Sequence, residues 1–135
     1  MKIVIATFNK GKFIEFKDLF CNSSFEVLSL ADFTTEDIDE TESSYEENAM
    51  LKAKKASELS NHPSLGDDSG LEVKLLNNAP GLFSARYSGK NATDETNIKK
   101  LLKAIKNLDN AKAKFISTLA FTIHKRILSF FLLAN

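Results

Sequence analysis

Two adjacent carboxylates, Asp67 and Asp68, precede Ser69 and Gly70 between two apolar segments of the chain. A carboxylate in such a place can hold a divalent metal ion and polarise a water molecule. A second interpretation stays open, because Asp-Asp-Ser-Gly is also typical of a turn closed by an Asp side chain and glycine. In an extended segment neighbouring side chains point to opposite faces, so only one of the two acids is expected to face a site.

A second group of acids lies in the segment 31–44, which is expected to be a loop and contains Asp39, Glu40 and Glu42. Magnesium binds carboxylates together with water and phosphate oxygens, so one acid from this loop and one from another segment would suffice. Taken alone, the segment is interpreted more simply as a solvated acidic loop.

A polar segment between a predicted strand and a predicted helix is a candidate phosphate-binding loop. It contains Thr7, Phe8, Asn9, Lys10, Gly11 and Lys12. The free backbone N–H groups and the dipole of a helix N-terminus favour a bound phosphate, and Lys12 can reach phosphate oxygens. The segment lacks the Walker P-loop pattern. The alternative is an ordinary strand-to-helix turn with surface lysines.

Two further cations are candidates for contact with a phosphate. Lys52 lies on a predicted helix, where a lysine usually belongs to the solvated face. Arg86 can bind a phosphate with two parallel hydrogen bonds, or pair with a local carboxylate.

The elements that must position these residues follow from the apolar pattern. Strands are expected at residues 2–7, 25–30, 71–76 and 115–123, and helices at 12–20, 45–59 and 94–108. Ser44 is the predicted N-cap of the second helix, with Glu47 completing a capping box, and Thr93 is the predicted N-cap of the third. Strands and helices that alternate in this way are typical of the α/β class.

The composition of the 135-residue chain fits one domain with a hydrophobic core, since 43% of its residues are hydrophobic. A formal net charge of zero argues against binding of a nucleic-acid polymer. The single cysteine, Cys21, excludes an intramolecular disulfide. The apolar run 127–134 is shorter than the ~20 residues of a membrane span. A cytoplasmic protein without membrane contact is expected.

Four segments together resemble the inosine/xanthosine triphosphate pyrophosphatase family, also called Ham1-like. They are Thr7-x-Asn9-x-x-Lys12-x-x-Glu15, Glu46-Glu47-Asn48-Ala49-x-x-Lys52-Ala53, Asp67-Asp68-Ser69-Gly70-Leu71-Glu72-Val73 and Ala79-Pro80-Gly81-Leu82-Phe83-Ser84-Ala85-Arg86-Tyr87-Ser88-Gly89. Each segment is a weak signal, but four in this order and spacing are a strong one. The resemblance covers residues 2 to 123 or so.

The resemblance implies a mixed, twisted central sheet with flanking helices in a two-lobed pyrophosphatase architecture, and a homodimer. It also implies Mg²⁺-dependent hydrolysis of dITP, ITP and XTP to the monophosphate and pyrophosphate, which cleanses the nucleotide pool. By the same resemblance Asp68 is the catalytic residue, and Glu40 and Asp68 hold the metal. Residues 7–12 would form the triphosphate loop, and Lys52, Ser69 and Arg86 would contact the substrate.

The end of the chain departs from the family. Members continue further and carry purine-reading motifs that do not occur here, so residues 1–123 are expected to be the N-terminal part of a single domain. Residues 124–135 are expected to be a divergent apolar tail, produced by a frameshift or a truncated gene. The alternative function is a catalytically impaired remnant that at most binds nucleotide. A third is a structural partner that dimerises through its apolar tail.

Overall fold

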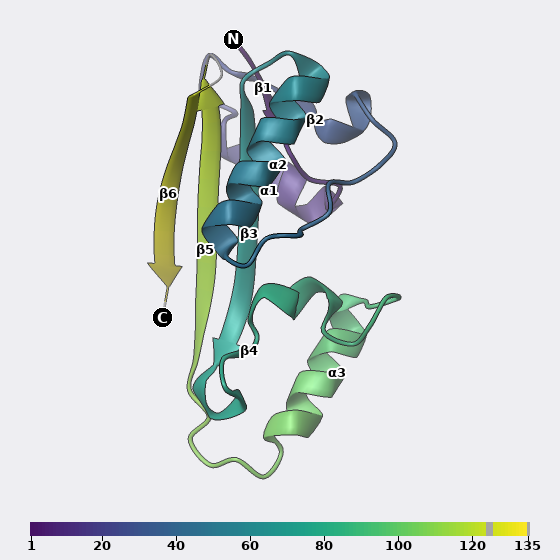
Figure 1. Ribbon diagram of the computed structural model, residues 1–135, viewed down its shortest axis with the longest axis vertical. Helices are drawn as coiled ribbons and strands as arrows, with labels where there is room; N and C mark the ends of the chain where they lie inside the picture. The colour runs from purple at the N-terminus through teal and green to yellow at the C-terminus, as the bar shows by residue number, and fades with distance from the viewer. Residues whose placement is uncertain (124–125, 135) are drawn as a thin grey trace. The chain divides into compact units, whose positions relative to one another are not determined.

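A mixed β-sheet with helices forms the framework of the protein in a computed structural model that describes residues 1–123 and 126–134 (Figure 1). The strands are β1 (Lys2–Ile5), β2 (Glu26–Ser29), β3 (Ser64–Val73), β4 (Ala79–Pro80), β5 (Ala113–Ile123) and β6 (Arg126–Ala134). The helices are α1 (Lys10–Leu19), α2 (Tyr45–Ser60) and α3 (Asp94–Ile105), and short 3₁₀ helices cover Leu30–Asp32, Lys74–Leu76 and Gly81–Arg86. The predicted α/β class and mixed sheet are therefore confirmed.

The strand order of the sheet is β2-β1-β3-β5-β6, and β4 pairs with β3. β1 is parallel to both β2 and β3, whereas β3 and β4 are antiparallel. The chain divides into two compact units, one made of residues 1–68 and 118–131 and the other of residues 69–117 and 132–135. All the contacts described below lie within one unit or the other.

The core of the first unit forms on both faces of β1. Ile3 and Ile5 pack with aromatic side chains of α1, such as Phe13, whereas Val4 packs on the other face against Ala56 of α2. The three β1 residues are at most 1% exposed. The strand predicted at residues 2–7 is therefore confirmed for Lys2–Ile5, and its burial on both faces agrees with its continuous apolar run.

Helix α2 lies unusually close to β3. Its stripe of small residues, which includes Ala49 and Ala53, is completely buried. A Cβ atom at Gly66 of β3 would lie 2.1 Å from the Ala49 carbonyl oxygen and 2.6 Å from the Ala53 backbone nitrogen. Only glycine fits such a contact, so the first half of α2 is held directly against the segment of β3 that carries the two acids.

The interpretation of residues 67–70 as a turn is wrong, and the strand predicted at 71–76 is confirmed only for residues 71–73. β3 is continuous from Ser64 to Val73, and Lys74–Leu76 is a 3₁₀ helix. The segment stays extended because Asp67 and Asp68 find partners on opposite faces of the strand, on α1 and α2 respectively. Neither side chain is therefore needed to close a local turn.

The helix starts agree with the local sequence signals. The Ser44 hydroxyl accepts a hydrogen bond from the Glu47 backbone N–H at 3.1 Å, which confirms the N-cap of α2. The Glu47 carboxylate accepts from the Ser43 hydroxyl, so it does not complete the predicted capping box. In the second unit, Thr93 caps α3 and Thr96 makes the reciprocal bond.

The end of the described chain is strand β6, which lies beside β5 in the sheet. The predicted tail 124–135 thus corresponds to this strand, except for residues 124, 125 and 135, which lie outside the described residues. No helix among the described residues is long and apolar enough to cross a membrane.

Candidate active site

Asp68 is the central ionisable group of the first unit. Its residue is only 2% exposed, and its carboxylate oxygen Oδ2 accepts a hydrogen bond from Asn48 Nδ2 of α2 at 3.0 Å. Burial and, to a smaller extent, the negative charge of Glu40 raise the pKa of Asp68 from 3.8 to about 6. The Asn48 hydrogen bond and the charges of Lys52 and Lys12 oppose this rise. A carboxyl with a pKa near neutrality is suited to accept and release a proton.

Asn48 links Asp68 to the acidic loop. It is 1% exposed, and while its amide nitrogen donates to Asp68, its Oδ1 accepts from the Glu42 backbone N–H at 2.9 Å. Sequence reasoning missed this role, although Asn48 belongs to one of the matched motifs. The signal was available, since an amide beside a stripe of buried alanines needs polar partners.

Lys52 and Glu40 form a largely buried ion pair one helical turn further along α2. Lys52 Nζ lies 2.9 Å from Glu40 Oε1, and the side chains are 8% and 20% exposed. The interpretation of Lys52 as part of a solvated helix face is therefore wrong. A burial of this kind requires a partner, and the acidic loop supplies it.

Asp67 lies on the opposite face of β3. Its Oδ2 is 2.5 Å from Nζ of Lys12 on α1, and its side chain is 7% exposed. The expectation that these two neighbouring side chains point to opposite faces of the strand is confirmed. Asp67 therefore anchors the lysine of the candidate phosphate loop, while Asp68 faces α2.

The candidate phosphate loop is shaped by its own side chains. The Thr7 hydroxyl accepts from the Asn9 N–H at 3.1 Å, and Asn9 Oδ1 caps α1 by accepting from the Lys12 N–H at 3.1 Å. Lys10 and Gly11 are exposed in the first turn of α1, whereas Phe8 packs against the hydrophobic core. Phe8 is therefore a packing residue. Binding of a phosphate by the exposed first turn of α1 stays a prediction.

Ser69 and Arg86 belong to the second unit. The Arg86 guanidinium lies 4.9 Å from the centre of the Phe83 ring. Their contacts with a substrate remain predictions from the sequence. The residues that the structure brings together within the first unit are Asp68, Asn48, Glu40, Lys52, Lys12 and Asp67.

The donor chemistry of Glu40 and Asp68 suits a hard divalent cation. Among the described residues no group of three or more His, Cys, Asp or Glu could hold a metal ion by itself. The two carboxylates are nevertheless close enough for the charge of Glu40 to raise the pKa of Asp68, and the Lys52 ammonium partly neutralises the pair. Magnesium requires only one or two carboxylates when water and phosphate oxygens complete its shell.

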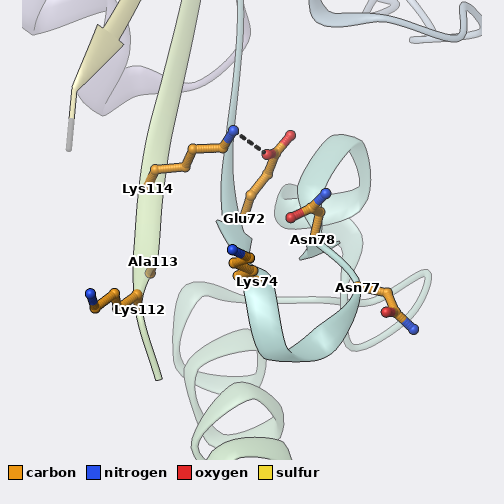
Figure 2. Close-up of a pocket in the computed structure, with 7 residues that line it drawn as sticks. All are labelled: Glu72, Lys74, Asn77, Asn78, Lys112, Ala113 and Lys114. Atoms are coloured by element: carbon orange, nitrogen blue, oxygen red, sulfur yellow. Dashed lines mark ion pairs between the residues drawn. The ribbon is translucent and has the colours of Figure 1, made fainter. Parts of the chain in front are cut away.

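The second unit contains a separate cavity of about 710 Å³ at the end of β3 and β5 (Figure 2). Three lysines surround it, and one of them, Lys114, is paired with Glu72 at 3.2 Å. The lining residues are Glu72, Lys74, Asn77, Asn78, Lys112, Ala113 and Lys114. None of the residues predicted from the sequence to bind substrate or metal is among them.

The protein is an α/β protein in which strand β3 presents a buried carboxyl beside a second carboxylate and two lysines. The chain belongs to the Ham1 family, whose profile matches residues 3–131.

Individual relatives agree with this assignment. The chain is 46% identical over 125 residues to a dITP/XTP pyrophosphatase of Haemophilus influenzae, and 45% identical over 133 residues to one of Listeria innocua. These matches cover 91% and 96% of the chain. A Ham1 protein of Coxiella burnetii superposes with a TM-score of 0.85 at 36% identity, over 99% of this chain and 71% of that one. The Staphylococcus aureus Ham1 protein gives 0.81 at 39% identity, over 96% and 68%.

The chain is shorter than these relatives. It spans 64% of the length of the Haemophilus influenzae protein and 63% of that of a Vibrio parahaemolyticus relative, less than two thirds in both cases.

Proposed function

We propose that this protein hydrolyses dITP, ITP and XTP to the nucleoside monophosphate and pyrophosphate, with Asp68 as its catalytic residue. One observation carries the proposal. Asp68 is buried, has a pKa of about 6, and faces the Glu40–Lys52 ion pair within one compact unit. The Haemophilus influenzae and Listeria innocua relatives are dITP/XTP pyrophosphatases, which supports the same substrate class.

The proposed role of Asp68 is to orient a water molecule and take its proton. The oxygen of that water forms a bond to the α-phosphorus, and the bond from this phosphorus to the bridging oxygen breaks. Pyrophosphate leaves with the electron pair of the broken bond, and the proton of the water passes to Asp68. At neutral pH a pKa of about 6 keeps most of the carboxyl ionised and able to accept a proton.

Glu40 and Asp68 are the proposed ligands of Mg²⁺, which would offset the negative charge of the phosphates when bound. Lys12 and Lys52 supply further positive charge from α1 and α2. In this proposal each lysine exchanges its carboxylate partner, Asp67 or Glu40, for phosphate oxygens. The exposed first turn of α1 contributes backbone N–H groups. Substrate contacts of Ser69 and Arg86 are proposed from the sequence resemblance alone.

The test is a pyrophosphate-release assay with purified protein, Mg²⁺ and each of dITP, ITP and XTP. We expect turnover that requires Mg²⁺ and falls by at least about 100-fold in Asp68→Asn, since an amide cannot accept the proton. Glu40→Gln should raise the Mg²⁺ concentration needed for half-maximal turnover. The matched control is Asp39→Asn, an exposed acid beside Glu40, which should retain wild-type turnover.

Binding without turnover would instead support the nucleotide-binding remnant. Calorimetric titration of ITP in the presence of Mg²⁺ distinguishes this outcome, because binding would be measured while pyrophosphate release stayed at the level of Asp68→Asn.

We also propose a cytoplasmic location and a homodimer, and sedimentation of the purified chain tests the latter. A monomer at all concentrations would contradict it.

A further inference from the structure

One buried hydroxyl of the first unit has no hydrogen-bond partner among the described residues. It is Oγ1 of Thr118, on β5, and the residue is completely buried. Nearly all buried polar groups in proteins are paired, because an unpaired one loses its hydrogen bonds to water without gaining others. A β-branched apolar residue such as valine would fill the same volume without an unpaired polar group. The presence of a hydroxyl here therefore suggests a function for it.

The hydroxyl-bearing face of β5 is the face that packs on α2. Residues 116, 118, 120 and 122 alternate along the strand and are all buried. Ala120 forms one hydrophobic cluster with Ala49 and Ala53 of α2. These are the two helix residues whose backbone a Cβ atom at Gly66 of β3 would meet. Thr118 therefore faces the same side of the sheet as the even-numbered residues of β3.

Two contacts between the segments of β3 and β5 indicate that Thr118 lies opposite Asp68. Ser64 lies beside Thr122, whose hydroxyl bonds both the backbone N–H and the carbonyl oxygen of Ser64, at 3.0 and 3.2 Å. Just beyond the end of β3 and the start of β5, the Lys74 N–H donates to the Lys112 carbonyl oxygen at 3.3 Å. Both contacts fit one antiparallel register, in which residue 66 opposes 120 and residue 68 opposes 118. Directly opposed residues have Cβ atoms about 5 Å apart.

Asp68 has an acceptor to spare at this position. Asn48 donates to its Oδ2, and no described residue donates to its Oδ1. A change of χ1 between staggered wells moves the Thr118 hydroxyl without altering the volume that the side chain fills. The Thr118 hydroxyl, an unused donor, and Asp68 Oδ1, an unused acceptor, thus lie on opposed residues of paired strands. Both residues are buried.

We propose that Thr118 is a positioning residue for Asp68: its hydroxyl donates to Oδ1 and, with Asn48 on Oδ2, fixes the plane of the carboxylate that orients the attacking water. The role rests on the proposed hydrolysis. Thr122 is the matched control, because it has the same side chain on the same face of the same strand. Its hydroxyl, however, is hydrogen-bonded to the backbone of Ser64.

The first test is a comparison of turnover in Thr118→Val, Thr118→Ser and Thr122→Val. We expect Thr118→Val to lower kcat about tenfold with KM unchanged, which corresponds to one lost hydrogen bond to a charged group. Thr118→Ser should recover kcat to within about threefold. Thr122→Val should lower stability and leave the kcat of the folded protein unchanged. Wild-type kcat in Thr118→Val would overturn the proposal.

A second test does not require turnover, so that an inactive wild type would count only against the proposed function. The unfolding equilibrium is measured at pH 8 without nucleotide for Thr118→Val, Asp68→Ala and the double variant. A hydrogen bond between the two residues predicts a coupling of about fivefold or more in the equilibrium constant. Thr122→Val combined with Asp68→Ala should show none. If Thr118 and Asp68 are uncoupled, or if Thr118→Val raises the stability, the proposal is wrong.

Discussion

Asp68→Asn should make the protein more stable at pH 8, although it removes the proposed catalytic group. Folding transfers this carboxyl from water to a site where its pKa rises from 3.8 to about 6. A shift of two units corresponds to about 3 kcal/mol between the protonation states. Solvent screens part of this, so we expect a gain of about 1–2 kcal/mol.

The gain should depend on pH in a defined direction. Because the pKa is higher in the folded protein, the contribution of Asp68 to stability is fully present below pH 3.8 and is lost as pH rises through about 6. The asparagine has no proton to lose. The difference in unfolding free energy between Asp68→Asn and wild type should therefore be small near pH 4 and reach its full value by pH 8.

Urea unfolding between pH 4 and pH 8 in metal-free buffer measures this difference. The control is Asp67→Asn, which removes the ion pair with the half-exposed Lys12 and should lower stability at pH 8 by up to about 1 kcal/mol. The two adjacent acids are thus expected to respond with opposite signs. A loss of stability in Asp68→Asn at pH 8, or a gain of equal size at pH 4 and pH 8, would refute the reasoning.

Four further changes test the packing, the charges and a helix cap. Gly66→Ala places a Cβ atom against the α2 backbone and should cost at least about 3 kcal/mol in urea unfolding. Gly11→Ala, whose nearest contact is a side-chain oxygen at 3.3 Å, should stay within about 1 kcal/mol of wild type. Lys52→Met leaves two buried carboxylates without their cation and should cost about 2–4 kcal/mol at pH 8, part of which millimolar Mg²⁺ should restore in a thermal shift. Ser44→Ala removes the cap of α2 and should cost about 1 kcal/mol, read as a shift of the urea midpoint.

Local signals in the sequence predicted the parts of the fold that depend on local contacts. The caps at Ser44 and Thr93 were predicted because each involves only the first turn of its own helix. The alternation of a strand also predicted that Asp67 and Asp68 face opposite sides. Since the α/β class follows from the order of elements, it was predictable as well.

Contacts between distant segments account for the errors. The turn at residues 67–70 was wrong because the partners that keep Asp67 and Asp68 extended lie on α1 and α2. Lys52 was interpreted as a surface residue because its partner is in a loop twelve positions earlier. The role of Asn48 depends on both α2 and β3. In each case the sequence shows the residue type but not the partner, and the partner decides the burial.

The contact at Gly66 has a consequence for how the chain finds its fold. A slip of β3 by one residue would turn Asp67 instead of Asp68 toward α2. A slip by two would keep the face but bring Ser64 or Asp68 to the position where the α2 backbone leaves no room for a Cβ atom. Because only a residue without a Cβ atom fits at the position of Gly66, these shifted pairings of β3 are sterically excluded. This exclusion selects, during folding, which of two identical carboxyls faces α2.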